Sequence, residues 1–159
     1  MKPPPCALLL PILVGLGSAC TPSLQGSRDP ARLAAVRRVV VLPFATPEGA
    51  PRSLADGFAD EISSELGGAR FAVVDRGADA SADAVLIGRV VAYHDQAVTH
   101  DLDTSLAVSV RIVDVRTNEV VLSTSSNATA AATLCAQEMT CLRGKVMTAI
   151  GRFIVEGGK

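Results

Sequence analysis

Two histidine–aspartate pairs are the residues whose types and spacing come nearest to a chemical site. His94-Asp95 and His100-Asp101 begin six positions apart, and imidazole and carboxylate groups from one loop can converge on a metal ion. However, the spacing follows no defined ligand pattern, and the segment is expected to connect two strands, where exposed polar residues are usual. We interpret the pairs as a solvated loop and keep a small metal- or ligand-dependent periplasmic protein as an alternative function.

Other polar motifs point away from catalysis. Asp56, Asp60 and Glu61 recur along a predicted helix, which makes them its solvated side and not a catalytic pair. Pro43 and Pro47 stand where a phosphate-binding loop would need backbone N–H groups. The serine clusters lack a neighbouring base in any recognisable context. The sequence therefore predicts a protein that is not an enzyme, with no catalytic residues, no metal site and no cofactor.

The four cysteines separate into two groups. Cys6 and Cys20 lie near the N-terminus, and Cys135 and Cys141 remain as a pair. In an oxidising compartment a disulfide is the default for such a pair, and we predict one here. Helix positions six apart diverge in direction and are separated by about 9 Å along the axis, which is too far for a bridge. The bridge thus requires a closed loop, with the regular helix starting near Cys141.

Residues 1–19 have the layout of a secretory signal peptide. Lys2 gives a positive start, residues 7–16 are apolar, and residues 17–19 are small. An apolar run of about ten residues is too short for a bilayer, which needs roughly twenty. We therefore expect cleavage before Cys20 and no membrane span.

Cys20 directly follows these small residues and resembles the lipid-attachment cysteine of bacterial lipoproteins. In that family the cysteine becomes the N-terminus and carries the lipid. Gly17 stands where leucine is usual, with Leu16 one position earlier, so cleavage after Ala19 without lipidation is the alternative. Thr21 follows where an aspartate would indicate retention in the inner membrane. The resemblance thus implies a lipid anchor at the periplasmic face of the outer membrane.

The composition indicates a single globular domain after the leader. The chain has 159 residues, 48% of them hydrophobic and 3% aromatic, with a net charge of -1. Without a block of lysine or arginine and with few aromatics, it lacks the features of nucleic-acid binding. We expect residues 20–35 to be a lipidated N-terminus with a flexible tether and residues 36–156 to form one domain.

Hydrophobic periodicity predicts the elements of that domain. The continuous β-branched run at 37–44 is typical of a strand buried on both faces. A stripe at every fourth position predicts a helix with Ser53 as its N-cap. That stripe consists of Leu54, Phe58, Ile62 and Leu66. Further strands are expected at 70–75, 84–93, 104–115 and 119–126, and a helix at 142–155. The prediction is an α+β fold: strand–helix–strand, an antiparallel meander and a C-terminal helix, in a mixed five-stranded sheet with both helices on one face.

Two positions in the predicted strands carry more specific expectations. Gly88 marks either a bulge or a close contact. The strand containing residues 120–122 is a possible sheet edge that a partner strand can extend. Alternatively, its polar neighbours only blunt that edge.

Four segments in this order resemble a group of periplasmic lipoprotein domains. They are residues 39–44 (VVVLPF), 54–76 (ending in FAVVDR), 82–90 (ADAVLIGRV) and 113–120 (VDVRTNEV). The group includes the curli-secretion lipoprotein, the activator lipoproteins of penicillin-binding proteins, and the N-terminal domain of the Tol translocation β-propeller protein. The LPS-assembly lipoprotein (LptE type) is similar in layout.

The resemblance has two departures and one functional implication. This chain has no room for the hairpins that build the curli-secretion barrel, and Thr21-Pro22 replaces the Gly-Tyr pair of the LPS-assembly family. The resemblance implies a non-catalytic, membrane-tethered module that binds another envelope protein during cell-envelope biogenesis. An LPS-assembly role in the outer-membrane translocon is the alternative.

Overall fold

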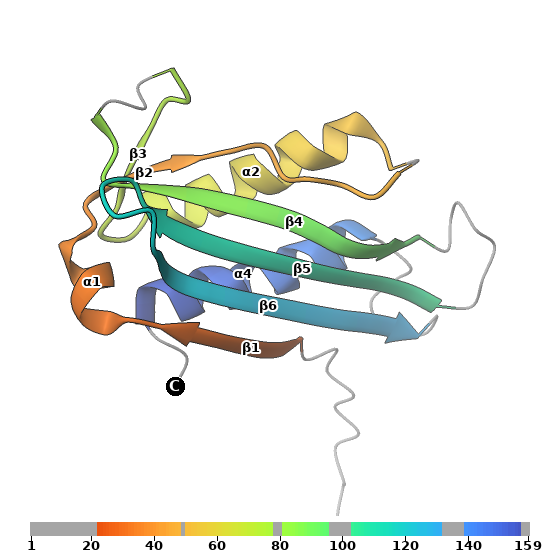
Figure 1. Ribbon diagram of the computed structural model, residues 1–159. Helices are drawn as coiled ribbons and strands as arrows, with labels where there is room; N and C mark the ends of the chain where they lie inside the picture. The colour runs from red at the N-terminus through yellow and green to blue at the C-terminus, as the bar shows by residue number, and fades with distance from the viewer. Residues whose placement is uncertain (1–21, 49, 78–80, 96–102, 132–138, 157–159) are drawn as a thin grey trace, which may run out of the picture.

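The computed structural model describes residues 22–48, 50–77, 81–95, 103–131 and 139–156. These ranges form an α+β fold with one mixed, open sheet of six strands and with three helices (Figure 1). The elements are β1 (Ser23–Arg28), α1 (Pro30–Ala35), β2 (Arg38–Val41), α2 (Arg52–Gly67), β3 (Ala72–Val74), β4 (Ala84–His94), β5 (Asp103–Asp114), β6 (Val120–Ala131) and α4 (Met139–Glu156). Among the described residues, no helix has both the length and the apolar character needed to cross a membrane.

The strand order is β1-β6-β5-β4-β2-β3. β2 runs parallel to both β3 and β4, whereas the β4–β5, β5–β6 and β6–β1 pairs are antiparallel. The first half of the domain is thus the predicted strand–helix–strand unit, and the second half is the predicted meander. All of the predicted strands are present, and the sixth strand, β1, was not predicted.

β2 has the buried environment that its continuous apolar sequence predicts. Val39, Val40 and Val41 are all buried, because β2 has hydrogen-bonded neighbours on both sides and side chains packed on both faces. The strand ends at Val41, before Pro43, which has no N–H to donate to a neighbouring strand. The parallel pairing therefore lasts only three residues on each side.

α2 places its predicted apolar stripe against the sheet. Leu54, Phe58, Ile62 and Leu66 are all buried in the core. The predicted N-cap was wrong, however. Pro51 is the N-cap residue, without a side-chain hydrogen bond, and Ser53 already lies in the first turn.

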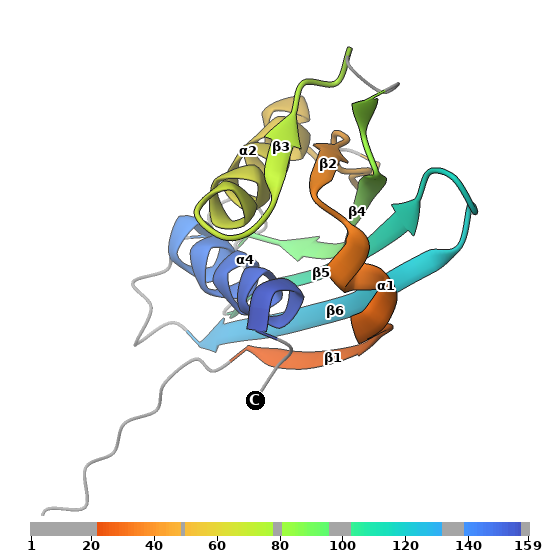
Figure 2. The same ribbon diagram turned by 90° about the vertical axis from the view of Figure 1, so that its left-hand side faces the viewer.

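α4 lies beside α2 on the same face of the sheet (Figure 2). Leu142, Val146 and Ile150, which recur every fourth residue along this helix, are fully buried. The helix starts at Met139, three residues before the predicted start at Leu142. The two helices and the inward-facing residues of β4, β5 and β6 enclose one hydrophobic core.

The largest correction concerns residues 23–35, which the sequence assigned to a flexible tether. They form β1 and α1 instead. β1 pairs with β6 from Ser23 opposite Asn127 to Arg28 opposite Leu122. Asp29 then caps α1, because its carboxylate accepts hydrogen bonds from the N–H groups of the first turn. The folded body therefore begins thirteen residues before the predicted boundary at residue 36.

Candidate interaction surface

Over β4, β5, β6 and β1, the sheet face opposite α2 and α4 has no covering helix among the described residues (Figure 2). Strand alternation places every second residue of the meander on this open face, while the residues between them enter the core. We define the open face by its central residues on β4, β5, β6 and β1: Ile87, Arg89, Val91, Ala107, Ser109, Arg111, Ser123, Ser125, Asn127, Ser23, Gln25 and Ser27. The side chains are mostly small, so the surface is broad and shallow.

The β4–β5 part of the open face combines two arginines with exposed apolar side chains. Arg89 lies opposite Ser109, and Arg111 lies opposite Ile87 on the neighbouring strand. Together with Val91 these residues line a hollow of ≈ 420 Å³. Ile87 and Val91 are 46% and 58% exposed and lie on the same face of β4. This combination is typical of an interaction surface.

No carboxylate among the described residues forms an ion pair with either arginine. Two guanidinium groups on adjacent strands therefore give the open face a positive field. The hollow is suited to carboxylates, which arginine binds with parallel hydrogen bonds.

The outer side of α2 carries the opposite charge. Asp56 and Asp60 are exposed, and Asp56 has only a loose ion pair with Arg76, with 3.6 Å between Oδ1 and Nη1. These two aspartates confirm the predicted solvated side of α2. Glu61 departs from that prediction, because it turns towards α4 and not towards solvent. Its Oε2 lies 2.9 Å from Nε of Arg143, and both side chains are about two-thirds buried.

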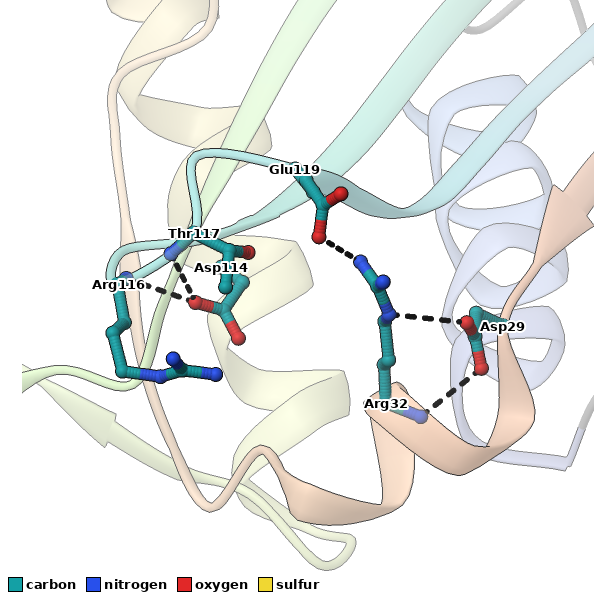
Figure 3. A network of polar contacts seen from close by, with 6 residues as sticks. All are labelled: Asp29, Arg32, Asp114, Arg116, Thr117 and Glu119. Carbon is teal, nitrogen blue, oxygen red and sulfur yellow. Dashed lines mark hydrogen bonds and ion pairs between the residues drawn. The ribbon is translucent and has the colours of Figure 1, made fainter.

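At the α1 end of the sheet, polar contacts link α1 to the β5–β6 turn and stabilise the turn itself (Figure 3). Arg32 of α1 contacts both the Asp29 cap and Glu119 at the β5–β6 turn. In that turn, the Asp114 carboxylate accepts hydrogen bonds from the N–H groups of Arg116 and Thr117. These bonds stabilise the ionised form and lower the pKa of Asp114. All of these contacts are made within α1 and the β5–β6 turn, so we interpret them as stabilising the turn.

Asp83 performs a comparable structural role at the start of β2. Its Oδ2 accepts hydrogen bonds from the backbone N–H groups of Arg37, at 3.0 Å, and Arg38, at 2.8 Å. The pKa of Asp83 is lowered, chiefly by these two bonds. The carboxylate thereby connects the loop before β4 to the beginning of its parallel neighbour.

The histidine–aspartate pairs fall only partly within the described residues. His94 ends β4 and Asp95 follows it, whereas His100 and Asp101 lie outside those residues. Asp95 accepts a hydrogen bond from the hydroxyl of Tyr93 at 3.1 Å, and burial raises the pKa of that hydroxyl. In the described part of the chain, no three histidine, cysteine, aspartate or glutamate side chains gather as metal ligands.

The predicted cysteine sites remain predictions. Cys20 and Cys135 lie outside the described residues, so neither lipidation nor the disulfide is tested. Cys141 is exposed in the first turn of α4. Because α4 already begins at Met139, a bridge to Cys135 would start from within the helix.

The predicted strand-addition site at residues 120–122 was wrong. β6 is not an edge strand, because β1 pairs along it from Leu122 to Asn127, and the N–H of Asp29 bonds to the Val121 carbonyl. The chain's own N-terminal segment thus occupies the position proposed for a partner. The open face was not predicted from the sequence, although Ile87, Arg89 and Val91 at every second position of one strand contained that signal.

Solved structures share this architecture. No family model matches the chain, and no curated protein does so either. A PelC dodecamer from Paraburkholderia phytofirmans aligns with a TM-score of 0.69 at 17% identity, over 84% of this chain and 98% of that one. The same fold occurs in lipoprotein GNA1162 from Neisseria meningitidis, which aligns with a TM-score of 0.54 at 18% identity, over 74% of this chain and 97% of the other.

A third structure extends the likeness to another group. A DUF4136 family protein from Bacteroides thetaiotaomicron aligns with a TM-score of 0.55 at 11% identity, over 80% of this chain and 92% of that protein. At these identities the similarity shows the fold alone.

Proposed function

We propose that this chain is a lipid-anchored, non-catalytic assembly module of the bacterial cell envelope. In this proposal Cys20 carries the lipid and holds the domain at the periplasmic face of the outer membrane. The observation that carries the proposal is the position of β1. This strand starts at Ser23, three residues after Cys20, which resembles the lipid-attachment cysteine of bacterial lipoproteins. The shared fold with lipoprotein GNA1162 supports the same assignment.

A lipid on Cys20 would fix the orientation of the domain. Three extended residues span at most about 10 Å, which leaves little slack between the lipid and Ser23. The end of the sheet where β1 begins would therefore face the bilayer (Figure 1). The opposite end, with α1 and the β5–β6 turn, would face the periplasm.

The open face supports an assembly role over an enzymatic one. It offers a broad, shallow surface with exposed Ile87 and Val91, in contrast to the enclosed, mostly apolar pockets in which small ligands bind. The PelC structure is a dodecamer, so at least one protein with this fold forms an assembly of copies. We therefore propose a protein partner for this surface.

Intact-mass spectrometry of the chain purified from bacterial membranes tests the anchor. We expect a mature chain that begins at an acylated Cys20, and a Cys20→Ala variant that is released from the membrane fraction. A mature chain with an unmodified N-terminus, or full-length protein in the cytosol, would overturn the proposal. Crosslinking of the anchored protein tests the assembly role. Recovery of an LPS-translocon barrel as the crosslinked partner would favour the LPS-assembly function instead.

A further inference from the structure

The open face and the outer side of α2 lie on opposite sides of the domain and carry opposite charges. Arg89 and Arg111 make the open face positive, and Asp56 and Asp60 make the outer side of α2 negative. We infer that copies of this chain associate head to tail, with α2 of one copy seated on the open face of the next. This inference rests on the proposed assembly function and names the partner of the open face as a second copy.

The shapes of the two surfaces fit this arrangement. Around the arginines, the open face presents Ser109, Ser123 and Ser125, which leave room for a helix to approach closely. The exposed residues of α2 are also small, because Ser53 and Ser64 flank the two aspartates along the same side. Few long side chains would have to be ordered when the surfaces meet, which lowers the entropic cost of association.

The charge pattern selects α2 over its neighbour in the helix layer. α4 carries the exposed basic residue Arg152. This residue would repel the arginines of the open face. Asp60 has no ion-pair partner among the described residues, and the contact of Asp56 with Arg76 is loose. Both aspartates are therefore available for the guanidinium groups of a second copy.

The two surfaces differ from each other, so the contact is heterologous. A pair of copies therefore still has one free surface at each end. Such contacts continue until they close into a ring or extend as a filament. Adjacent copies would stack along the direction perpendicular to the sheet, whereas β1 runs within the sheet. Every copy can therefore direct the start of β1, and its lipid, to the same membrane.

Charge reversal on each surface tests the inference with the acylated protein in detergent, studied by sedimentation velocity and native mass spectrometry. The sheet variant carries Arg89→Glu and Arg111→Glu, and the helix variant carries Asp56→Arg and Asp60→Arg. We expect the wild type to self-associate and each variant to do so at least about tenfold more weakly, because like charges then face each other. Arg116→Glu, in the exposed β5–β6 turn, is the matched control and should leave association unchanged.

One mixture and one combined variant identify the contact as heterologous. The sheet variant retains α2 and the helix variant retains the open face, and their two substituted surfaces also carry opposite charges. An equimolar mixture should therefore regain association, with the two variants alternating, whereas each variant alone associates weakly. A chain with all four substitutions should recover self-association, because both charges are exchanged. Thermal unfolding of each variant confirms that the fold is retained.

Several results would overturn the inference. An acylated wild type that stays monomeric at all concentrations would exclude self-association while leaving the lipid-anchored function intact. Association that survives both charge reversals would place the interface elsewhere. Binding of a different envelope protein through Arg89 and Arg111 to the monomeric chain would assign the open face to that protein instead. A missing lipid would contradict the proposed function itself.

Discussion

Gly88 of β4 lies directly against the ring of Phe44. A Cβ atom on Gly88 would be 2.3 Å from Cε1 and Cζ of that ring, well inside van der Waals contact. Phe44 is buried and stacks on Phe58 of α2, with 5.6 Å between the ring centroids. The glycine therefore makes space for the segment that leaves β2, which passes along β4 and forms an isolated bridge between Ala45 and Arg89.

This relationship predicts a large effect for a single added methyl group. We expect Gly88→Ala to lower the free energy of unfolding by about 1–3 kcal/mol, because the buried Phe44 ring must move. Gly77→Ala is the matched control, since no atom lies within 4 Å of a Cβ there. Urea unfolding followed by circular dichroism measures both. The destabilisation by Gly88→Ala should be smaller in a Phe44→Leu background. An equally large destabilisation there would show that it comes from the main-chain conformation at position 88 and not from the contact with Phe44.

The ion pair between Glu61 and Arg143 connects α2 to α4. Its Nε–Oε2 distance is 2.9 Å, and the guanidinium also lies 5.9 Å from the Phe58 ring centroid. We expect Glu61→Ala to destabilise the domain by about 1–2 kcal/mol, more than a fully exposed pair would. A double-mutant cycle with Arg143→Ala measures the coupling, and Asp60→Ala on the exposed side of α2 is the control. Zero coupling would show that the pair is energetically neutral.

The sequence predicts those elements whose pattern reflects burial. Val39, Val40 and Val41 form a continuous apolar run because β2 is covered on both faces, and Phe58 and Ile62 recur at helical spacing because α2 lies on the sheet. Gly88 was assigned to a bulge or a close contact, and the close contact is present. The register shift of this strand lies a little further on, between Val90 and Ala92.

The elements that were missed are held by interactions that leave little trace in a sequence. β1 has the sequence SLQGSR, in which only Leu24 packs on the core, and it is held by backbone hydrogen bonds to β6. Backbone pairing is independent of side-chain type, so a polar edge strand resembles a linker. Glu61 was assigned to the solvent for a related reason: the position of α4 beside it depends on tertiary packing.

The same reasoning predicts the consequence of removing β1. Deletion of residues 22–28 should lower the free energy of unfolding by at least about 2 kcal/mol, from the lost ladder hydrogen bonds alone. It also exposes the edge of β6, so we expect concentration-dependent aggregation measured by light scattering. A chain that begins at Pro22 retains β1 and serves as the control. Unchanged stability and solubility after the deletion would contradict the pairing.

Gly26 offers a test of β1 that does not shorten the chain. A Cβ at Gly26 would lie 2.8 Å from the ring of Phe153 in α4 and from the Ser123 carbonyl oxygen. We expect Gly26→Val to destabilise the domain by about 1–3 kcal/mol through this overlap. Ser27→Val, on the open-face side of the same strand, is the matched control. Equal effects of the two substitutions would argue against the contact with Phe153.

Asp83 predicts how stability depends on pH. Because the N–H groups of Arg37 and Arg38 bond to its ionised form, the pKa of Asp83 lies below 3.8 in the folded state. Because the pKa is lower in the folded state, the stabilisation by Asp83 is complete at a pH above the pKa of the unfolded chain. It is lost as the pH falls through the pKa of the folded state. We therefore expect the stability difference between wild type and Asp83→Asn to be constant above about pH 5 and to shrink at lower pH. Asp83→Ala removes both acceptor oxygens and should cost about 1 kcal/mol even at neutral pH. Urea unfolding across this pH range measures all three proteins, and a difference that stays constant down to pH about 2.5 would show that Asp83 does not act through its ionised form.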